Sequence, residues 1–256
     1  MADLVRPSAG ITFLIYHRVG ARTPVPVDLP TALFDEQMAM LADSFRVLTI
    51  DEATRELLDT TGADAGPGVV VTFDDGTADF LDEAVPVLVD RGVPATMYLA
   101  TRHIEEQIEF PGGGVPMTWA AARTALGSGL VTFGSHSHSH VLFDRITPSA
   151  ASEELDRSIG LIGDRLGVAP EHFAYPKALL ASPRVEAQVR SRFETAVIAR
   201  TRPNRPGRVD PFRLTRSPIQ VADGIRWFER KASGGMGLED DLRGLANRWR
   251  YRGARS

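Results

Sequence analysis

The fold of this chain is indicated by the stretch Val69-Val70-Val71-Thr72-Phe73-Asp74-Asp75-Gly76. Its β-branched and aromatic residues are typical of a strand buried on both faces, and the glycine favours a turn directly after it. The two aspartates then stand at the carboxyl end of a parallel strand, where α/β proteins and βα-barrels gather ligands and catalytic groups. Adjacent side chains on an extended chain point in different directions, so we expect one carboxylate to meet a cation and the other a proton. A helix cap beside a solvated aspartate is the alternative interpretation.

The rest of the chain alternates between strand-like and helical segments. This alternation predicts a parallel sheet with helices outside it, and 256 residues with 43% hydrophobic content suit a single α/β barrel. We predict a barrel domain over residues 1–235 and a basic tail over 236–256. The longest predicted helix covers residues 148–166 and ends at Gly167. The other strand-like runs lie at residues 11–16, 46–50, 94–100, 130–134, 171–175, 194–199 and 212–216.

A second polar cluster, Gly134-Ser135-His136-Ser137-His138-Ser139-His140, ends the run at 130–134. If the segment turns helically, His136 and His140 share one face and His138 points away. A histidine-rich tract alone also fits a solvated loop. Together with the carboxylates at another strand end, the tract predicts an Asp-His-His site for a divalent cation. Three protein ligands and one open position are typical of catalytic zinc.

These two stretches resemble motifs of the polysaccharide deacetylases, also called carbohydrate esterase family 4 or the NodB-homology domain. The first family motif, TFDDG, matches residues 72–76, and the second, H-S/T-x-x-H, matches residues 136–140. The resemblance extends over residues 11–228 and implies a distorted (β/α)7 TIM-like barrel. It also implies that Asp74 is the general base and that Asp75, His136 and His140 hold a divalent metal. Zinc is the expected metal, with cobalt or nickel as alternatives.

The third family motif, an arginine followed by Pro-Pro-Tyr-Gly, is altered here. Residues 173–178 read Phe-Ala-Tyr-Pro-Lys-Ala, which is similar to the FAYP variant of exopolysaccharide and poly-N-acetylglucosamine deacetylases. Ala174 takes the place of the arginine that steadies the base in the family. Lys177 replaces a tyrosine whose backbone N–H forms the oxyanion hole, and a backbone donor survives a change of side chain. An ordinary loop after a strand is the alternative interpretation of this segment.

The histidine of the last family motif, which carries the general acid, is missing, since no histidine follows His172. The run at 11–16, however, leads into His17-Arg18-Val19, and Tyr16 to Val19 resembles the YHRV signature of circularly permuted members. The resemblance implies that His17 is the general acid. A hydrogen-bonded histidine at the barrel rim is the alternative.

A replacement for the missing arginine is suggested by the run at 212–216. Strand alternation places Arg216 on the same face as Leu214 and Pro218. If that face is interior, the guanidinium needs a buried carboxylate, and Asp74 is an eligible partner. An arginine on the surface is the commoner alternative.

Composition and charge limit the partners and the cellular location that we expect. A formal net charge of −4 argues against a general nucleic-acid binder, and the absence of cysteine excludes disulfides. Residues 243–256 hold five arginines and no acid, which suits either an anionic membrane surface or a solvated helix end. The sequence shows neither a signal peptide nor a transmembrane run, so we expect a cytoplasmic location, with export as the alternative. The oligomeric state is not predicted.

The resemblance implies that the protein is a metal-dependent hydrolase that removes N-acetyl groups from an amino-sugar-containing polysaccharide or glycan intermediate. An O-acetyl carbohydrate esterase would use the same residues. A cyclic-amide hydrolase of the same fold usually lacks the metal motifs that are intact here. Ala174 leaves a third alternative open, a non-catalytic glycan-binding protein.

Overall fold

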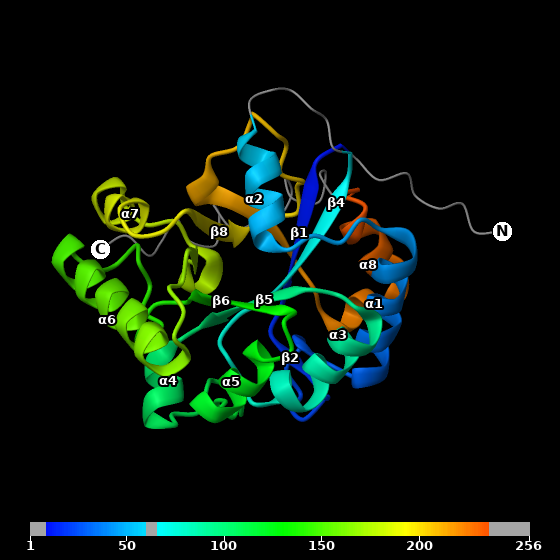
Figure 1. Ribbon diagram of the computed structural model, residues 1–256, viewed down its shortest axis with the longest axis horizontal. Coiled ribbons are helices and arrows are strands. Elements are labelled where there is room, and N and C mark those ends of the chain that lie inside the picture. The colour runs from blue at the N-terminus through cyan, green and yellow to red at the C-terminus, as the bar shows by residue number, and fades with distance from the viewer. Residues whose placement is uncertain (1–8, 60–65, 236–256) are drawn as a thin grey trace.

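The computed structural model describes residues 9–59 and 66–235 as a closed barrel of parallel strands surrounded by helices (Figure 1). The strands follow the order β1-β4-β5-β6-β7-β8-β9, and β1 closes the barrel by pairing with β9. The tail expected at 236–256 lies outside the described residues. The barrel strands are β1 (Ile11–Tyr16), β4 (Gly68–Phe73), β5 (Ala95–Leu99), β6 (Val131–Ser135), β7 (His172–Ala174), β8 (Thr195–Ala199) and β9 (Leu214–Pro218), and a small separate sheet pairs β2 (Arg18–Val19) with β3 (Asp28–Leu29).

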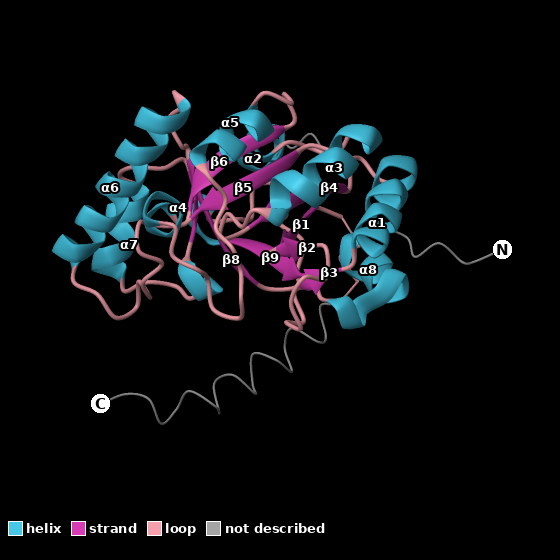
Figure 2. Ribbon diagram, turned by 90° about the horizontal axis from the view of Figure 1, so that it is seen from below, coloured by secondary structure: helices cyan, strands magenta, loops and turns pink. Residues whose placement is uncertain are grey.

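The helices cover the outside of the barrel (Figure 2). One group, α1, α3 and α8, lies on one side of the strands, and α6 and α7 lie together on the opposite side. None of the described helices combines the length and the apolar character that crossing a membrane requires. The helices are α1 (Thr31–Ser44), α2 (Ile50–Leu58), α3 (Val85–Arg91), α4 (Thr101–Glu106), α5 (Trp119–Leu126), α6 (Pro148–Leu166), α7 (Pro183–Arg190) and α8 (Gly224–Ala232).

Strand β4 is the buried strand that the sequence predicts before Asp74 and Asp75. All six of its residues are buried, as are all six residues of β1 beside it. The two strands run in register from Ile11 opposite Gly68 to Tyr16 opposite Phe73. Their carboxyl ends therefore coincide, and the Asp74 backbone N–H donates to the Tyr16 carbonyl at 3.1 Å. The residues that follow these strands are brought together at one end of the barrel.

The opposite, amino end of the barrel is closed by α2. This helix lies beside the beginnings of β1 and β4 (Figure 1). Its apolar residues Ile50, Ala53 and Leu57 join the interior cluster that contains Phe13 and Val70. Apolar packing therefore fills much of this end, next to a polar contact between Asp51 of α2 and the buried His172 ring.

The predicted run at 46–50 is the one strand-like segment that is not a barrel strand. Only Val47 pairs with β4, through a single bridge to Val69, and α2 begins at Ile50. Helix α2 begins there because the Thr49 side chain accepts from the Glu52 N–H, while Glu52 accepts from the Thr49 N–H.

The other predicted strands occur in the barrel. The longest predicted helix is confirmed as α6, which ends at Gly167 with φ of 73°.

Candidate metal centre and active site

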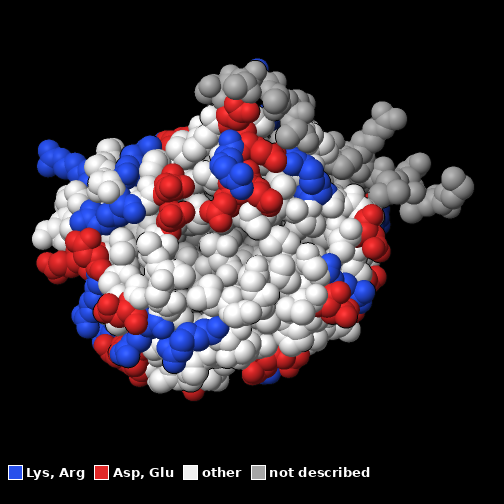
Figure 3. All heavy atoms as spheres, in the orientation of Figure 1, with Lys and Arg blue, Asp and Glu red and all other residues white. Residues whose placement is uncertain are grey.

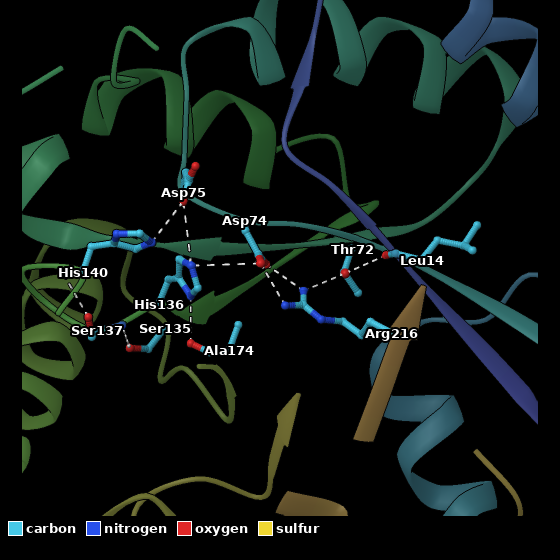
Figure 4. A network of polar contacts seen from close by, with 10 residues as sticks. All are labelled: Leu14, Thr72, Asp74, Asp75, Ser135, His136, Ser137, His140, Ala174 and Arg216. Atoms are coloured by element: carbon cyan, nitrogen blue, oxygen red, sulfur yellow. Dashed lines mark hydrogen bonds and ion pairs between the residues drawn. The ribbon is translucent and has the colours of Figure 1, made fainter. Parts of the chain in front are cut away.

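Asp74 leaves the end of β4 and points into the barrel, where it meets Arg216 of β9 (Figure 4). Two parallel hydrogen bonds join the side chains: Arg216 Nη1 donates to Asp74 Oδ1 at 2.7 Å and Nη2 to Oδ2 at 2.8 Å. Nη1 also donates to Thr72 Oγ1 at 2.9 Å, and that hydroxyl donates to the Leu14 carbonyl at 2.7 Å. The carboxylate is therefore fixed in position by a bidentate ion pair.

Arg216 is fully buried, so the interpretation as a surface arginine is wrong. Its guanidinium carbon lies 5.2 Å from the centroid of the Tyr98 ring, a distance that permits a cation–π contact. Alternation along β9 turns this residue inward, and the closed barrel makes the inward face inaccessible to water. Arg216 thus contacts Asp74 from β9, whereas Ala174 on β7 has no charged side chain.

The environment of Asp74 sets its protonation. Burial by itself raises the pKa of this carboxyl, but the charge of the Arg216 guanidinium, together with its hydrogen bonds, outweighs burial and holds the pKa well below its usual range. Asp74 is consequently ionised throughout the neutral range. An isolated carboxylate at this depth would be unfavourable, and Arg216 supplies the compensating charge.

Asp75 diverges from Asp74 and faces two imidazoles from the loop after β6 (Figure 4). Its Oδ1 lies 3.7 Å from His136 Nε2 and 3.5 Å from His140 Nε2. The ligand atoms of these three residues all lie within 4.8 Å of one another. We call Asp75, His136 and His140 the carboxyl-end cluster. One carboxylate oxygen and two ring nitrogens form a donor set suited to zinc.

The hydrogen bonding of His136 leaves one ring nitrogen available to a cation. Its Nδ1 lies 2.7 Å from the Ala174 carbonyl oxygen, which can only accept, so Nδ1 carries the hydrogen and Nε2 has the free lone pair. Burial lowers the pKa of His136, and burial together with the neighbouring His136 lowers the pKa of His140. Both rings are therefore neutral, as ligation requires, and the cluster fits the expected metal.

The loop that carries these histidines differs from the predicted helical turn. Residues 136–140 form no helix, and Ser137 and His140 adopt left-handed conformations with φ of 65° and 58°. Asp75, at the end of β4, is also left-handed, with φ of 76°. Non-glycine residues rarely adopt this conformation, and such strain concentrates at functional sites. The two imidazoles thus converge through a strained loop, while His138 turns away and bonds Thr101.

The remaining predicted site residues flank this centre. His17 directly follows β1. Its Nδ1 is buried and finds no hydrogen-bond partner among the described residues. Lys177 follows β7 with φ of 55°, and its charge contributes to lowering the pKa of His140. The predicted site residues other than Arg216 therefore follow the carboxyl ends of barrel strands, and Arg216 reaches Asp74 with its side chain from within β9.

A family model for polysaccharide deacetylases matches residues 61–192, more than half of the chain. The chain belongs to the polysaccharide deacetylase family. It is 24% identical over 193 residues to YxkH of Bacillus subtilis strain 168, a candidate polysaccharide deacetylase by name. That match covers 74% of this chain and 64% of YxkH, so the chain spans less than two thirds of this relative.

Solved structures share the fold. IcaB from Ammonifex degensii superposes with a TM-score of 0.78 at 23% identity, covering 90% of this chain and 98% of IcaB. The deacetylase PplD of Streptococcus pyogenes, solved with acetate, gives a TM-score of 0.74 at 20% identity over 88% of this chain and 99% of PplD. This member of the family therefore shares its fold with both proteins over about nine tenths of its chain.

Several residues around the site were not predicted from the sequence. The Ala174 carbonyl, which fixes the His136 ring, has no sequence signal because any residue supplies a carbonyl. Glu154 of α6 accepts hydrogen bonds from the loop after β6, and only the packing of helix on barrel brings the two together. His103 of α4 stacks on Phe110, with ring centroids 4.1 Å apart. Its position three residues after the predicted strand at 94–100 was the one available signal.

The surface around the barrel has mixed charge. On the face drawn in Figure 3, acidic and basic side chains alternate around the periphery, and the middle of that face carries few of them. Most of the described ion pairs, such as Arg22 with Glu83 and Arg192 with Asp156, join partly exposed side chains. Such pairs add little stability individually. The Arg216–Asp74 pair differs from them because both of its side chains are buried.

Proposed function

We propose that this member of the polysaccharide deacetylase family is a metal-dependent hydrolase that removes N-acetyl groups from an amino-sugar-containing polysaccharide. The observation that carries the proposal is the convergence of Asp75, His136 and His140 beside the Asp74–Arg216 pair. A ligand set and an ionised carboxylate then face the same space. That combination serves hydrolysis of an acyl group better than simple glycan binding.

Each side chain has a role in the proposed reaction. Asp75, His136 and His140 would hold the cation, with zinc preferred and cobalt or nickel as alternatives. The bound cation would supply Lewis-acid chemistry, polarising the acetyl carbonyl and lowering the pKa of water. Asp74 would take a proton from the attacking water, and Arg216 would keep Asp74 ionised and oriented.

The departing amine of an amide must be protonated, and His17 is the proposed donor. It stands at the end of β1, which pairs directly with the strand that carries Asp74. The backbone N–H of Lys177 would stabilise the negative charge that develops on the acetyl oxygen. His17 and Asp74 would thus act as acid and base from neighbouring strand ends.

Arg216 also bears on the alternative of a non-catalytic glycan-binding protein. That alternative arose because Ala174 lacks the arginine side chain that steadies the base in the family. The bidentate contact from Arg216 provides such support from another strand. A protein that only binds glycan would have no need of a buried ion pair that keeps Asp74 ionised.

The proposal is tested by acetate release. Metal-stripped protein, reconstituted with zinc, cobalt or nickel, is incubated with N-acetylglucosamine oligomers and, separately, with an O-acetylated glycan. We expect metal-dependent release of acetate from the N-acetylated oligomers. No acetate from any glycan, with metal bound and glycan affinity measurable, would favour a binding protein instead.

His17 separates the amide from the ester substrate. An alkoxide leaving group depends less on a general acid than an amine does. His17→Ala should therefore reduce N-deacetylation by a factor of about 10²–10⁴ and reduce O-deacetylation less. Equal losses on both substrates would remove His17 from the role of acid.

A further inference from the structure

The histidine loop of the carboxyl-end cluster is held from one side by α4. The backbone N–H of Thr101 donates to the Ser137 carbonyl at 3.2 Å, and the N–H of Arg102 donates to the His138 carbonyl at 2.8 Å. These are N–H groups of the first turn of α4, which have no partner within their own helix. Helix α4 therefore provides donors for the Ser137 and His138 carbonyl groups of the loop. The backbone N–H groups of the loop need acceptors from another element.

Glu154 of α6 supplies those acceptors. Its Oε2 accepts from the backbone N–H of His138 at 3.0 Å and from that of Ser139 at 2.7 Å. Its Oε1 accepts from Ser139 Oγ at 2.6 Å. One carboxylate thus binds three donors on two consecutive loop residues, between the two proposed metal ligands His136 and His140.

One turn further along α6, Ser158 contacts the base of the same loop. Its Oγ lies 2.8 Å from Ser135 Oγ, which accepts from the Ser137 N–H at 3.2 Å. Residues four apart share one face of a helix, so Glu154 and Ser158 form a polar strip facing the loop. The apolar residues Ala151, Leu155 and Ile162 anchor α6 independently of this strip.

The loop needs such support because two of its residues are in the left-handed region. Ser137 and His140 keep φ angles of 65° and 58°, and the Ser137 Oγ accepts from the His140 N–H at 3.1 Å. Without an external acceptor the loop would relax toward commoner conformations, and His140 Nε2 would leave Asp75. Strained residues persist only where the surroundings hold them.

We propose that Glu154 is a positioning residue for the metal centre, which sets metal affinity by holding the His138–Ser139 backbone through three hydrogen bonds. The inference rests on the ligand set of the proposed function and extends it to a residue outside the family motifs quoted above. Partners that orient metal ligands typically change metal affinity tenfold to a hundredfold when removed. Glu154 acts on the ligands through the backbone of their loop.

Two substitutions separate hydrogen bonding from charge. Glu154→Ala removes all three acceptor contacts and should weaken zinc binding by about tenfold or more. Glu154→Gln loses the charge but keeps an oxygen for the two N–H groups, and its amide can donate to Ser139 Oγ. We expect Glu154→Gln to bind zinc within about threefold of the wild type. Glu153→Ala, which removes an exposed carboxylate from the adjacent position of α6, is the matched control and should leave affinity unchanged.

The measurement is the zinc dissociation constant of each full-length protein, obtained by competition with a coloured chelator. The visible spectrum of the cobalt-loaded proteins reports ligand geometry, and Glu154→Ala should alter it while Glu154→Gln should not. Wild-type affinity in Glu154→Ala, or an equal loss in both Glu154 variants, would overturn the proposal while leaving the ligand set intact. A wild-type protein that binds no zinc would overturn both the inference and the proposed function.

Discussion

The two ends of the barrel each hold a group of histidine and carboxylate side chains, and the two groups differ in their hydrogen bonding. In each group the potential ligand atoms lie within 4.8 Å of one another. The carboxyl-end cluster follows strands, whereas its counterpart lies where β7 begins and where α2 closes the barrel. We call this second group, Asp51, Glu171 and His172, the amino-end cluster.

The difference lies in what occupies the ring nitrogens. His136 uses only Nδ1, on a backbone carbonyl, and leaves Nε2 free beside Asp75. His172 uses both: Nε2 lies 2.8 Å from Asp51 Oδ1 and Nδ1 lies 2.8 Å from Thr195 Oγ1. A carboxylate can only accept, so Nε2 of His172 carries a hydrogen, and Nδ1 is occupied by its hydrogen bond with the threonine hydroxyl. Proximity of ligand atoms is thus a weaker criterion for a metal site than the presence of a free lone pair.

The largest expected effect comes from the base beside the carboxyl-end cluster. Asp74→Asn should reduce kcat/KM for deacetylation by about 10²–10⁴-fold, because the amide cannot take a proton from water. Bound metal should remain, since Asp74 lies outside the proposed ligand set. Asp82→Asn, at a half-exposed carboxylate, is the control and should match wild type. Full activity in Asp74→Asn would exclude its role as base.

Arg216→Ala should have the next largest effect, on both stability and pH dependence. Breaking a buried ion pair by removing one partner costs about 3–5 kcal/mol of unfolding free energy, measurable by urea denaturation at pH 7. Without Arg216, burial dominates and the pKa of Asp74 rises. The base is then protonated at higher pH, so the acid limb of the pH–rate profile should move upward. An unchanged profile would remove Arg216 from the site.

In the wild type, the ion pair between Asp74 and Arg216 makes the free energy of unfolding depend on pH. The pKa of Asp74 is lowered in the folded protein, so the stabilisation is present above the unfolded-state pKa of about 3.9. It is lost as pH falls through the folded-state pKa of Asp74. The double variant Asp74→Asn/Arg216→Met should recover part of the stability that Arg216→Ala loses, because it leaves no unpaired buried charge.

At the amino end, His172→Ala should affect stability alone. The buried ring joins α2 to the barrel through Asp51 and β8 through Thr195, and removing it leaves the buried threonine hydroxyl without its partner. We expect a loss of about 1–3 kcal/mol in unfolding free energy. Metal content and the metal dissociation constant should stay at wild-type values. A loss of metal in His172→Ala would show that the two ends are not functionally distinct.

The smallest expected effect is a dependence on pH of the free energy of unfolding of the metal-free protein. The pKa values of His136 and His140 are lowered by burial, so the unfolded chain takes up their protons first as pH falls below about 6.5. Unfolding free energy should then fall by at most about 1.4 kcal/mol per proton for each pH unit. Urea titrations at pH 7.5 and 5.5 measure this fall, which the double His136→Ala/His140→Ala variant should lack.

The sequence predicted the barrel because its signals are local. Runs of β-branched residues, a Gly at the end of α6 and the aspartates after β4 each report on a few neighbouring positions. The prediction of a strand at 46–50 was wrong because a capping box at Thr49 starts a helix within this β-like stretch. Local pattern cannot show which of two competing signals the tertiary structure favours.

The site was predictable only in part for a similar reason. Residues in motifs were identified, but the partner of Asp74 depended on barrel closure, which brings β9 against β1 and buries Arg216. The contacts from Glu154 and the Ala174 carbonyl are long-range and depend on helix packing and on backbone atoms. The loop at 136–140 reaches the expected convergence of imidazoles by left-handed residues, which no periodicity in the sequence indicates.

The central claim, that the carboxyl-end cluster binds the metal and the amino-end cluster does not, is tested most directly by metal content. Zinc is measured by elemental analysis in wild type, in His136→Ala/His140→Ala and in His172→Ala, each purified with zinc and freed of loosely bound ion. We predict about one zinc per chain in the wild type and in His172→Ala and almost none in the double variant, consistent with a three-ligand site. Undiminished zinc in the double variant, or zinc lost only in His172→Ala, would contradict the account.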